Sequence, residues 1–111
     1  MSVKVRVGLV GTGWWADVMY LPALQSHPQA EVVAICGRNR IRAEEMAAKY
    51  RIPGVYTDYA AMLAQGGLDA VMVATPDDTH HAITLAALRA GLHVLCDKPL
   101  ALNAQQAREM Y

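Results

Sequence analysis

Short runs rich in β-branched residues alternate along this chain with longer, alanine-rich stretches of helical periodicity, and this alternation constrains the fold more than any other feature. The strand-like runs are residues 3–10, 31–36, 55–56, 68–74 and 93–96. The helical stretches are residues 14–26, with a break or restart at Pro22, then 40–50, 58–65, 77–90 and a last one from Asn103. Strands separated by helices predict a parallel sheet covered on both faces. Right-handed crossovers then favour an α/β, doubly wound fold with strand order 3-2-1-4-5.

Length and charge narrow the classes of function. The chain has 111 residues, enough for one domain that we expect to span residues 1–111. Ten acidic residues balance ten basic ones, so the chain has no excess of positive charge to bind a nucleic-acid backbone, and we expect no nucleic-acid partner. No apolar run approaches the ~20 residues that cross a bilayer. The N-terminal residues enter a strand pattern without an apolar signal segment, which predicts a cytoplasmic protein with no membrane partner.

The cysteines and histidines do not form a recognisable metal site. Cys36 and Cys96 have no metal-ligand spacing, and the adjacent His80 and His81 point roughly 100° apart on a helix. In the expected strand order the two cysteines lie three strand spacings apart, roughly 14 Å, whereas a disulfide needs Cα atoms within ~7 Å. We therefore expect free thiols, packed as small apolar residues, and no metal.

A glycine-rich turn follows the first strand and predicts a nucleotide site. The segment Gly11-Thr12-Gly13-Trp14-Trp15-Ala16 matches G-x-G-x-x-G/A between a strand and a helix. In this motif Gly11 permits the tight turn, Gly13 lets the backbone approach a diphosphate, and Ala16 lets the helix pack on the strand. The helix N-terminus offers N–H groups to the anion. Trp14 and Trp15 either flank the cofactor or pack on neighbouring loops.

The end of the second strand indicates which dinucleotide is bound. An NAD-preferring site carries an acid there, but this sequence reads Cys36-Gly37-Arg38-Asn39-Arg40. Gly37 leaves room and Arg38 can reach a 2′-phosphate, so NADP is favoured over NAD. The competing interpretation is that Arg38 stacks on the adenine of NAD. Arg40 and Arg42 either assist or, as we expect for each, are solvated surface arginines.

Several segments together resemble the N-terminal domain of the Gfo/Idh/MocA family, which includes glucose–fructose oxidoreductase and inositol dehydrogenase. The resemblance spans essentially the whole chain and is most specific at the segment that follows the last strand. The matching segments are Gly8 to Gly13, Leu21 to Leu24, Cys36 to Asn39, Ala74-Thr75-Pro76 with His80, and Ala90 to Leu100, which contains Asp97-Lys98-Pro99. The fold implied is an NAD(P)-binding Rossmann domain.

The resemblance also implies roles for residues near the nicotinamide. Lys98 would be the catalytic residue, hydrogen-bonding the reacting hydroxyl of a sugar or polyol, with Pro99 shaping the turn. Its place after a parallel strand, where such sheets bind ligands, agrees with this role. Thr75 and Pro76 would line the nicotinamide ribose, with His80 at the following helix start. The family pattern is Glu-Lys-Pro, so Asp97 is a shorter acid beside the cofactor. Gly37, Arg38 and Asn39 would lie at the adenosine end.

The expected whole protein is an NAD(P)-dependent oxidoreductase acting on a sugar, polyol or related alcohol, and a homo-oligomer. Family members continue into a sixth strand and a substrate-binding domain, and we expect both to be missing from this chain. The isolated chain should therefore bind nucleotide weakly, self-associate through its exposed edge strand and turn over little substrate. Two alternatives stay open: a non-catalytic dinucleotide-binding module or sensor, and a fragment of a nicotinamide-assisted glycoside hydrolase.

Overall fold

The computed structural model describes residues 4–14, 16–65, 67–75, 79–96 and 104–110. Its strands are β1 (Val5–Val10), β2 (Ala30–Cys36), β3 (Gly54–Tyr56), β4 (Ala70–Val73) and β5 (His93–Cys96). Its helices are a π-helical segment η1 (Ala16–Tyr20), then α1 (Leu21–Ser26), α2 (Arg40–Tyr50), α3 (Tyr59–Gln65), α4 (His80–Arg89) and α5 (Ala104–Met110).

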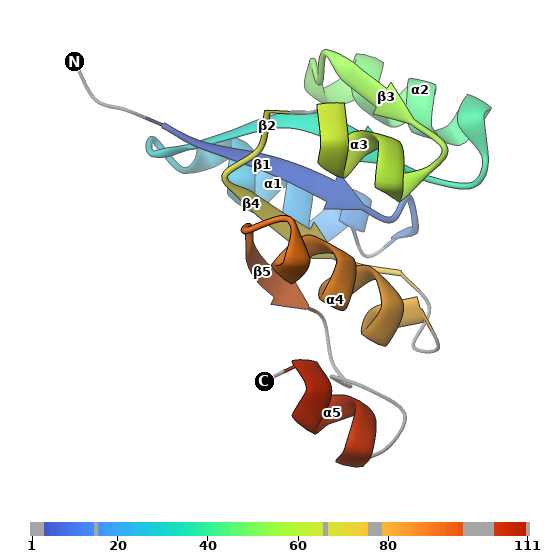
Figure 1. The fold of residues 1–111 in the computed structure, drawn as a ribbon. Helices are drawn as coiled ribbons and strands as arrows, with labels where there is room; N and C mark the ends of the chain where they lie inside the picture. Colours follow the sequence, from blue (N-terminus) through green and yellow to red (C-terminus); the bar gives the residue numbers. More distant parts are fainter. Residues whose placement is uncertain (1–3, 15, 66, 76–78, 97–103, 111) are drawn as a thin grey trace.

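The strands form one parallel sheet in the order β3-β2-β1-β4-β5 (Figure 1). The chain starts in the middle of the sheet at β1, moves outward through β2 to β3, then crosses over to β4 and moves outward again to β5. This is the doubly wound α/β fold and the strand order that the sequence predicts, and both are confirmed. The reversal of direction between β1 and β4 opens a crevice at the carboxyl ends of these strands, where ligands of such sheets bind.

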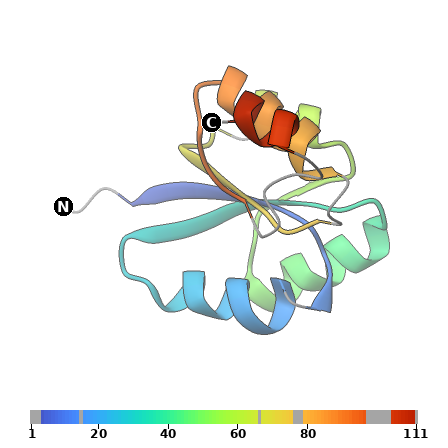
Figure 2. The same cartoon turned by 90° about the horizontal axis from the view of Figure 1, so that it is seen from below.

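Helices cover both faces of the sheet, as Figure 2 shows, with α1 and α2 on one side and α4 and α5 on the other. Each face has its own apolar core. Leu9 and Ile35 point toward the α1 and α2 side, where they pack with Leu21 and Met46. Residues of the opposite pleat, among them Val10, Val71 and Val73, pack with α3 and α4. Successive residues at the C-terminal end of β1, where the glycine turn begins, are therefore buried in different cores.

The sequence predicts a break or restart of the helix at Pro22, and the structure shows a restart. The backbone stays helical through Tyr20, whose φ and ψ are −75° and −46°, and α1 begins at the next residue. The residues just before are π-helical, over Ala16–Tyr20, and Pro22 lies in the first turn of α1. A proline is tolerated in a first turn because its missing N–H has no partner there anyway. The type of helix therefore changes from π to α between Tyr20 and Leu21, without an extended segment between the two.

The two cysteines are free thiols, as predicted, with Cys36 buried on β2 and Cys96 half-buried on β5. They lie on strands separated by β1 and β4, which explains why they cannot pair. Among the described helices, none is both long and apolar enough to cross a membrane.

Candidate dinucleotide-binding cleft

A cleft of about 850 Å³ lies along the carboxyl ends of the strands. It runs from the tip of β3 past β2 and β1 to the start of α4, and so covers the crevice where the strand order reverses. Its walls come from four places in the sequence that only the parallel sheet brings together. The lining residues are Val10–Gly13, Cys36–Asn39, Thr57–Tyr59, Ala74, Thr75, Thr79, Ala82 and Ile83.

Gly11 and Gly13 occupy different environments in the turn after β1. Gly11 has φ +130°, and a Cβ there would lie 2.2 Å from the carbonyl oxygen of Ala74. Its N–H donates to the Cys36 carbonyl at 2.8 Å, so the turn is tied to β2 while it touches the end of β4. A Cβ on Gly13, in contrast, would meet nothing within 4 Å. Gly11 is therefore needed by the fold itself, whereas the space beside Gly13 is open to a ligand.

Thr12 fills the space beside Gly37. A Cβ on Gly37 would lie 2.4 Å from the Thr12 methyl carbon and 2.7 Å from its hydroxyl oxygen. The sequence predicts that Gly37 leaves room for a phosphate; in the structure that room is taken by Thr12. The same contact explains why no acidic residue stands at this position, since any side chain would displace the tip of the glycine turn.

The polar residues after β2 make different contacts. Arg38 is exposed and lines the cleft, as the predicted 2′-phosphate contact requires. Asn39 lines the cleft too, but its side-chain oxygen accepts the Arg42 N–H at 3.1 Å and so caps α2. Arg40 forms an exposed ion pair with Glu44 one helical turn later, as expected of a surface arginine.

The expectation that Arg42 is a solvated surface arginine is wrong. Its side chain is 37% exposed, and its Nε donates to the Thr12 carbonyl at 3.1 Å. A terminal nitrogen of the same group lies 3.2 Å from the Asp17 carboxylate on η1. Arg42 therefore bridges α2 to the glycine turn and to the helical segment that follows it.

Asp17 is the centre of this polar cluster and is 14% exposed. The Tyr50 hydroxyl donates to its carboxylate at 2.6 Å, and Lys49 Nζ lies at 2.9 Å. The Tyr50 hydrogen bond, then Lys49 and Arg42, lower the pKa of Asp17 from 3.8 to about 2, against the opposing effect of burial. The same hydrogen bond to Asp17 raises the pKa of Tyr50. The carboxylate is consequently ionised throughout the physiological range, and the two cations leave the cluster with a net positive charge.

At the nicotinamide end that we predict, Thr75 follows β4 and lines the cleft. Its hydroxyl accepts from Thr79, which lines the cleft beside it. A ring nitrogen of His80 lies 2.9 Å from the Thr75 carbonyl oxygen, and His80 is only 1% exposed. The histidine thus holds Thr75 in place from behind, a position that fits a supporting role better than direct contact with a cofactor.

The segment after β3 lines the cleft too, although it was not among the predicted site residues. Thr57, Asp58 and Tyr59 line the cleft, and the Asp58 carboxylate accepts the Ala60 N–H at 3.1 Å at the start of α3. A usable signal was present, because residues that follow any parallel strand lie at the same edge of the sheet. Cys36 also lines the cleft, but burial and the nearby Asp58 charge raise its pKa to about 11, which keeps the thiol protonated and unreactive.

The remaining candidate residues fall into two groups. Trp14 is described and is 69% exposed, and its side chain does not line the cleft. The other five lie outside the described residues, so their predicted roles stay predictions: Trp15, Pro76, Asp97, Lys98 and Pro99. Within the described parts of the chain, no group of three or more potential metal ligands comes together, and the sequence predicts no metal.

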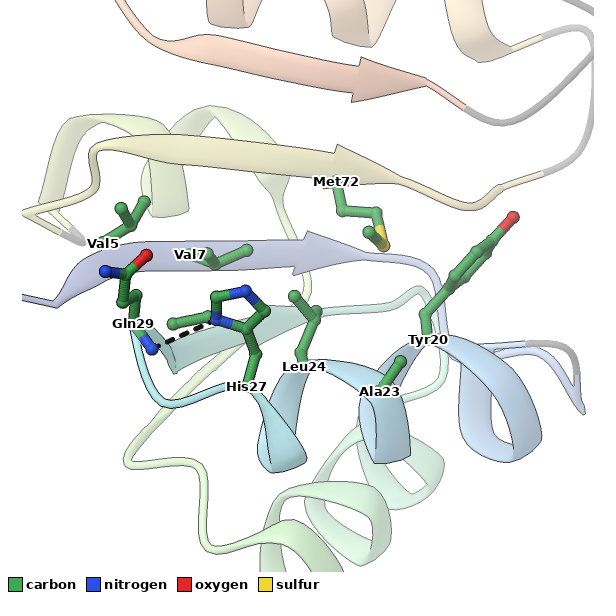
Figure 3. Close-up of a pocket in the computed structure, with 9 residues that line it drawn as sticks. Val5, Val7, Tyr20, Ala23, Leu24, His27, Gln29 and Met72 are labelled. Atoms are coloured by element: carbon green, nitrogen blue, oxygen red, sulfur yellow. Dashed lines mark hydrogen bonds between the residues drawn. The ribbon is translucent and has the colours of Figure 1, made fainter.

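A second hollow, of about 400 Å³, lies between α1 and the sheet, away from the glycine turn (Figure 3). Its walls are mostly apolar, with Val7 and Met72 from the sheet and Leu24 from α1. His27 borders it and accepts the Gln29 N–H at 3.1 Å through Nδ1. The hollow has no glycine turn and no exposed arginine, so it lacks the groups that hold a dinucleotide.

The fold and the cleft together define a dinucleotide-binding domain of the Rossmann class. Residues 5–111 match the family described as "Oxidoreductase family, NAD-binding Rossmann fold", GFO_IDH_MocA, and the chain belongs to this family. The resemblance drawn from the motifs is therefore confirmed.

The relatives are oxidoreductases of greater length. The chain is 38% identical over 109 residues to D-glucoside 3-dehydrogenase of Escherichia coli, covering 98% of this chain and 31% of the relative. It is 36% identical over 104 residues to D-xylose 1-dehydrogenase (NADP(+)) 2 of Haloferax volcanii, covering 94% of this chain and 32% of the relative. The chain therefore spans about a third of the length of the curated relatives it matches.

A solved structure shows the same fold. The 3-ketoreductase KijD10 of Actinomadura kijaniata, in complex with NADP, superposes with a TM-score of 0.90 at 37% identity, over 96% of this chain and 34% of that one. An oxidoreductase of Agrobacterium radiobacter, in complex with NAD+, L-tartaric acid and magnesium, gives a TM-score of 0.92 at 30% identity, over 97% of this chain and 31% of that one. Structures of similar fold thus hold either dinucleotide.

Proposed function

We propose that the cleft at the carboxyl edge of the sheet binds a nicotinamide dinucleotide, with its diphosphate against the turn Gly11 to Gly13. The observation that carries the proposal is the open space beside Gly13, just before the start of the first helical segment and inside a cleft of about 850 Å³. A backbone without a side chain at that point admits an anion to the N–H groups of the turn. The residues present fit the group that the family binds.

We further propose that the cofactor is NADP(H) rather than NAD(H). Arg38 is exposed on the wall of the cleft after β2 and offers a charged, forked donor to a 2′-phosphate. The acid that would select the ribose hydroxyls of NAD is missing at Gly37, and Thr12 occupies the space that its side chain would need. Both features favour a phosphorylated adenosine end.

In the whole protein we propose hydride transfer to or from a sugar, polyol or related alcohol. The nicotinamide ring supplies or accepts the hydride when bound. Thr75, held by Thr79 and His80, would line the ribose beside that ring. Lys98 would hydrogen-bond the reacting hydroxyl and hold its proton, because an alcohol that loses hydride must also lose a proton. Substrate contacts would come largely from the part of the relatives that this chain does not span.

Calorimetric titration of the 111-residue chain with NADP+ and NAD+ tests the cofactor proposal. We expect the wild-type chain to bind NADP+ more tightly than NAD+. Arg38→Ala should weaken the binding of NADP+ by about tenfold, because one charge-assisted contact is lost, while the affinity for NAD+ changes little. Arg40→Ala, on the same stretch but paired with Glu44 at the surface, is the matched control. Equal affinities in the wild-type chain, or equal losses for both cofactors in Arg38→Ala, would contradict the assignment of Arg38.

A further inference from the structure

The carbonyl oxygens of the glycine turn are anchored from two sides. The Thr12 oxygen accepts the Arg42 Nε–H at 3.1 Å, and the Gly13 oxygen accepts the Asp17 N–H at 3.2 Å. Asp17 is in turn bound through its carboxylate by Arg42. The guanidinium therefore contacts the turn directly, at the Thr12 oxygen, and is also linked to it through Asp17, whose N–H donates to the Gly13 oxygen.

Anchoring a carbonyl fixes the direction of the neighbouring N–H. In a planar trans peptide the C=O of one residue and the N–H of the next point in opposite directions. The Thr12 oxygen is held toward Arg42, so the Gly13 N–H points away from Arg42. The Gly13 oxygen is held toward the Asp17 N–H, so the Trp14 N–H points away from it. These are amide donors of the kind that bind a diphosphate at the start of a helix.

Two further residues of α2, Lys49 and Tyr50, hold Asp17 in the cluster that anchors the turn. The Tyr50 hydroxyl lies 2.6 Å from both the backbone oxygen and the carboxylate of Asp17, either of which can accept its single hydrogen, and Lys49 lies 2.9 Å from the same carboxylate. Two cations against one carboxylate also leave positive charge beside the turn, so Asp17 does not repel an incoming anion.

We propose that Arg42 is a positioning residue for the dinucleotide: it fixes the amide donors of Gly13 and Trp14 for the diphosphate and does not touch the cofactor itself. The inference rests on the proposed function of this cleft and extends it from the groups that contact the cofactor to the group that sets their geometry. It separates the two arginines of this region by role. Arg38 selects the 2′-phosphate, and Arg42 prepares the diphosphate site common to NAD and NADP.

The two roles give different affinity patterns. If a guanidinium contacts the 2′-phosphate, its removal lowers the affinity for NADP+ and 2′-AMP and leaves the affinity for NAD+ unchanged. If it acts through the turn, its removal lowers the affinities for NADP+ and NAD+ equally. The affinity for 2′-AMP, which has no diphosphate, then stays unchanged. The test uses Arg42→Met, which removes every donor, and Arg42→Lys, which keeps the charge but cannot bridge two acceptors as a fork does. Arg89→Met, at the exposed end of α4, is the matched control.

Affinities are measured by NMR titration of the 111-residue chain, with thermal unfolding recorded for every variant. We expect Arg42→Met to weaken the binding of NADP+ and NAD+ alike by about tenfold, as for loss of a charge-assisted hydrogen bond. The affinity of this variant for 2′-AMP should stay within about twofold of wild type. Arg42→Lys should lose nearly as much affinity for both dinucleotides. If Arg42→Met does not fold, Tyr50→Phe, which loosens Asp17, should show the same pattern with a smaller loss.

Three results would overturn the inference. A loss confined to NADP+ and 2′-AMP would place Arg42 on the 2′-phosphate, and full rescue by Arg42→Lys would reduce its role to charge alone. Unchanged affinities in a folded Arg42→Met variant would remove any role. In all three cases the cleft remains a dinucleotide site. Failure of the wild-type chain to bind either dinucleotide would instead overturn the proposed function, and this inference with it.

Discussion

Gly11 and Gly13 are two positions apart, yet substitution should affect different properties of the molecule. Gly11→Ala places a methyl group 2.2 Å from the Ala74 oxygen at a φ of +130°, so we expect a loss of roughly 2–3 kcal/mol or more in the free energy of unfolding. Gly13→Ala meets open space and should change stability little, while weakening dinucleotide binding by about tenfold because the methyl group stands where the diphosphate approaches. Urea unfolding and calorimetric titration of the pair measure both effects.

The contrary results are equally specific. If Gly13→Ala bound NADP+ as tightly as wild type, the diphosphate could not lie against that residue. If Gly11→Ala were as stable as wild type, the close approach of the turn to β4 would not be required for folding.

At this scale the sequence predicted part of the lining of the cleft, since the G-x-G turn and Arg38 both lie in its wall. Both could be found because the motif depends on spacing along one stretch of chain; their contacts with a cofactor stay predictions. The Arg42 contacts are not readable in this way, since Thr12 and Asp17 lie 30 and 25 residues away and meet Arg42 only in the folded protein. Gly37 was recognised as a position that needs space, but the side chain that uses the space, Thr12, could be identified only from the structure.

At the scale of elements, Asp17 fastens η1 to α2, and this attachment should depend on pH. Its pKa is lowered from 3.8 to about 2, so the stabilisation from its charged form is fully present above pH ~4 and is lost as the pH falls toward ~2. We expect the free energy of unfolding of Asp17→Asn to be lower than that of wild type at pH 7 by at most about 2 kcal/mol, since solvent screens the ion pair with the exposed Lys49 side chain.

The free energy of unfolding of both proteins, measured in urea between pH 7 and pH 2.5, checks this expectation. The difference between wild type and Asp17→Asn should shrink as the pH falls through that range. A difference that stayed constant, or grew on acidification, would show that the carboxylate does not carry the attachment. Glu44→Gln, which removes an exposed ion pair on the same helix, should show a much smaller difference at every pH.

The elements themselves were largely predictable. The α2 helix has the predicted bounds, because Ala43, Met46 and Ala47 recur at helical spacing and form its buried face. The fourth strand is shorter than predicted, Ala70–Val73 rather than residues 68–74, since an apolar run does not reveal where ladder pairing stops. The π-helical turn before Pro22 has no signature in the pattern of apolar residues, and the sequence analysis did not find it.

For the whole molecule, the strand order was predicted from the alternation of strands and helices together with the right-handedness of β-α-β crossovers, and the structure confirms it. Handedness and strand order then determine which carboxyl ends meet, and this brings the segments after β1, β2, β3 and β4 to one cleft. The apolar hollow beneath α1 follows from no local motif, because it depends on how far α1 extends over the sheet. Self-association through β5, which lies at the edge of the described sheet, stays a prediction.

The most direct test of the account is an amide chemical-shift map of the isotope-labelled chain titrated with NADPH. We expect the largest shifts on the amides of Gly13 and Trp14, with further shifts at Gly37, Arg38, Thr75 and Thr79. Residues around the apolar hollow, such as Leu24 and His27, should stay unchanged. Shifts concentrated at that hollow, or none at the glycine turn at a saturating concentration of NADPH, would contradict the central claim that this turn holds the diphosphate.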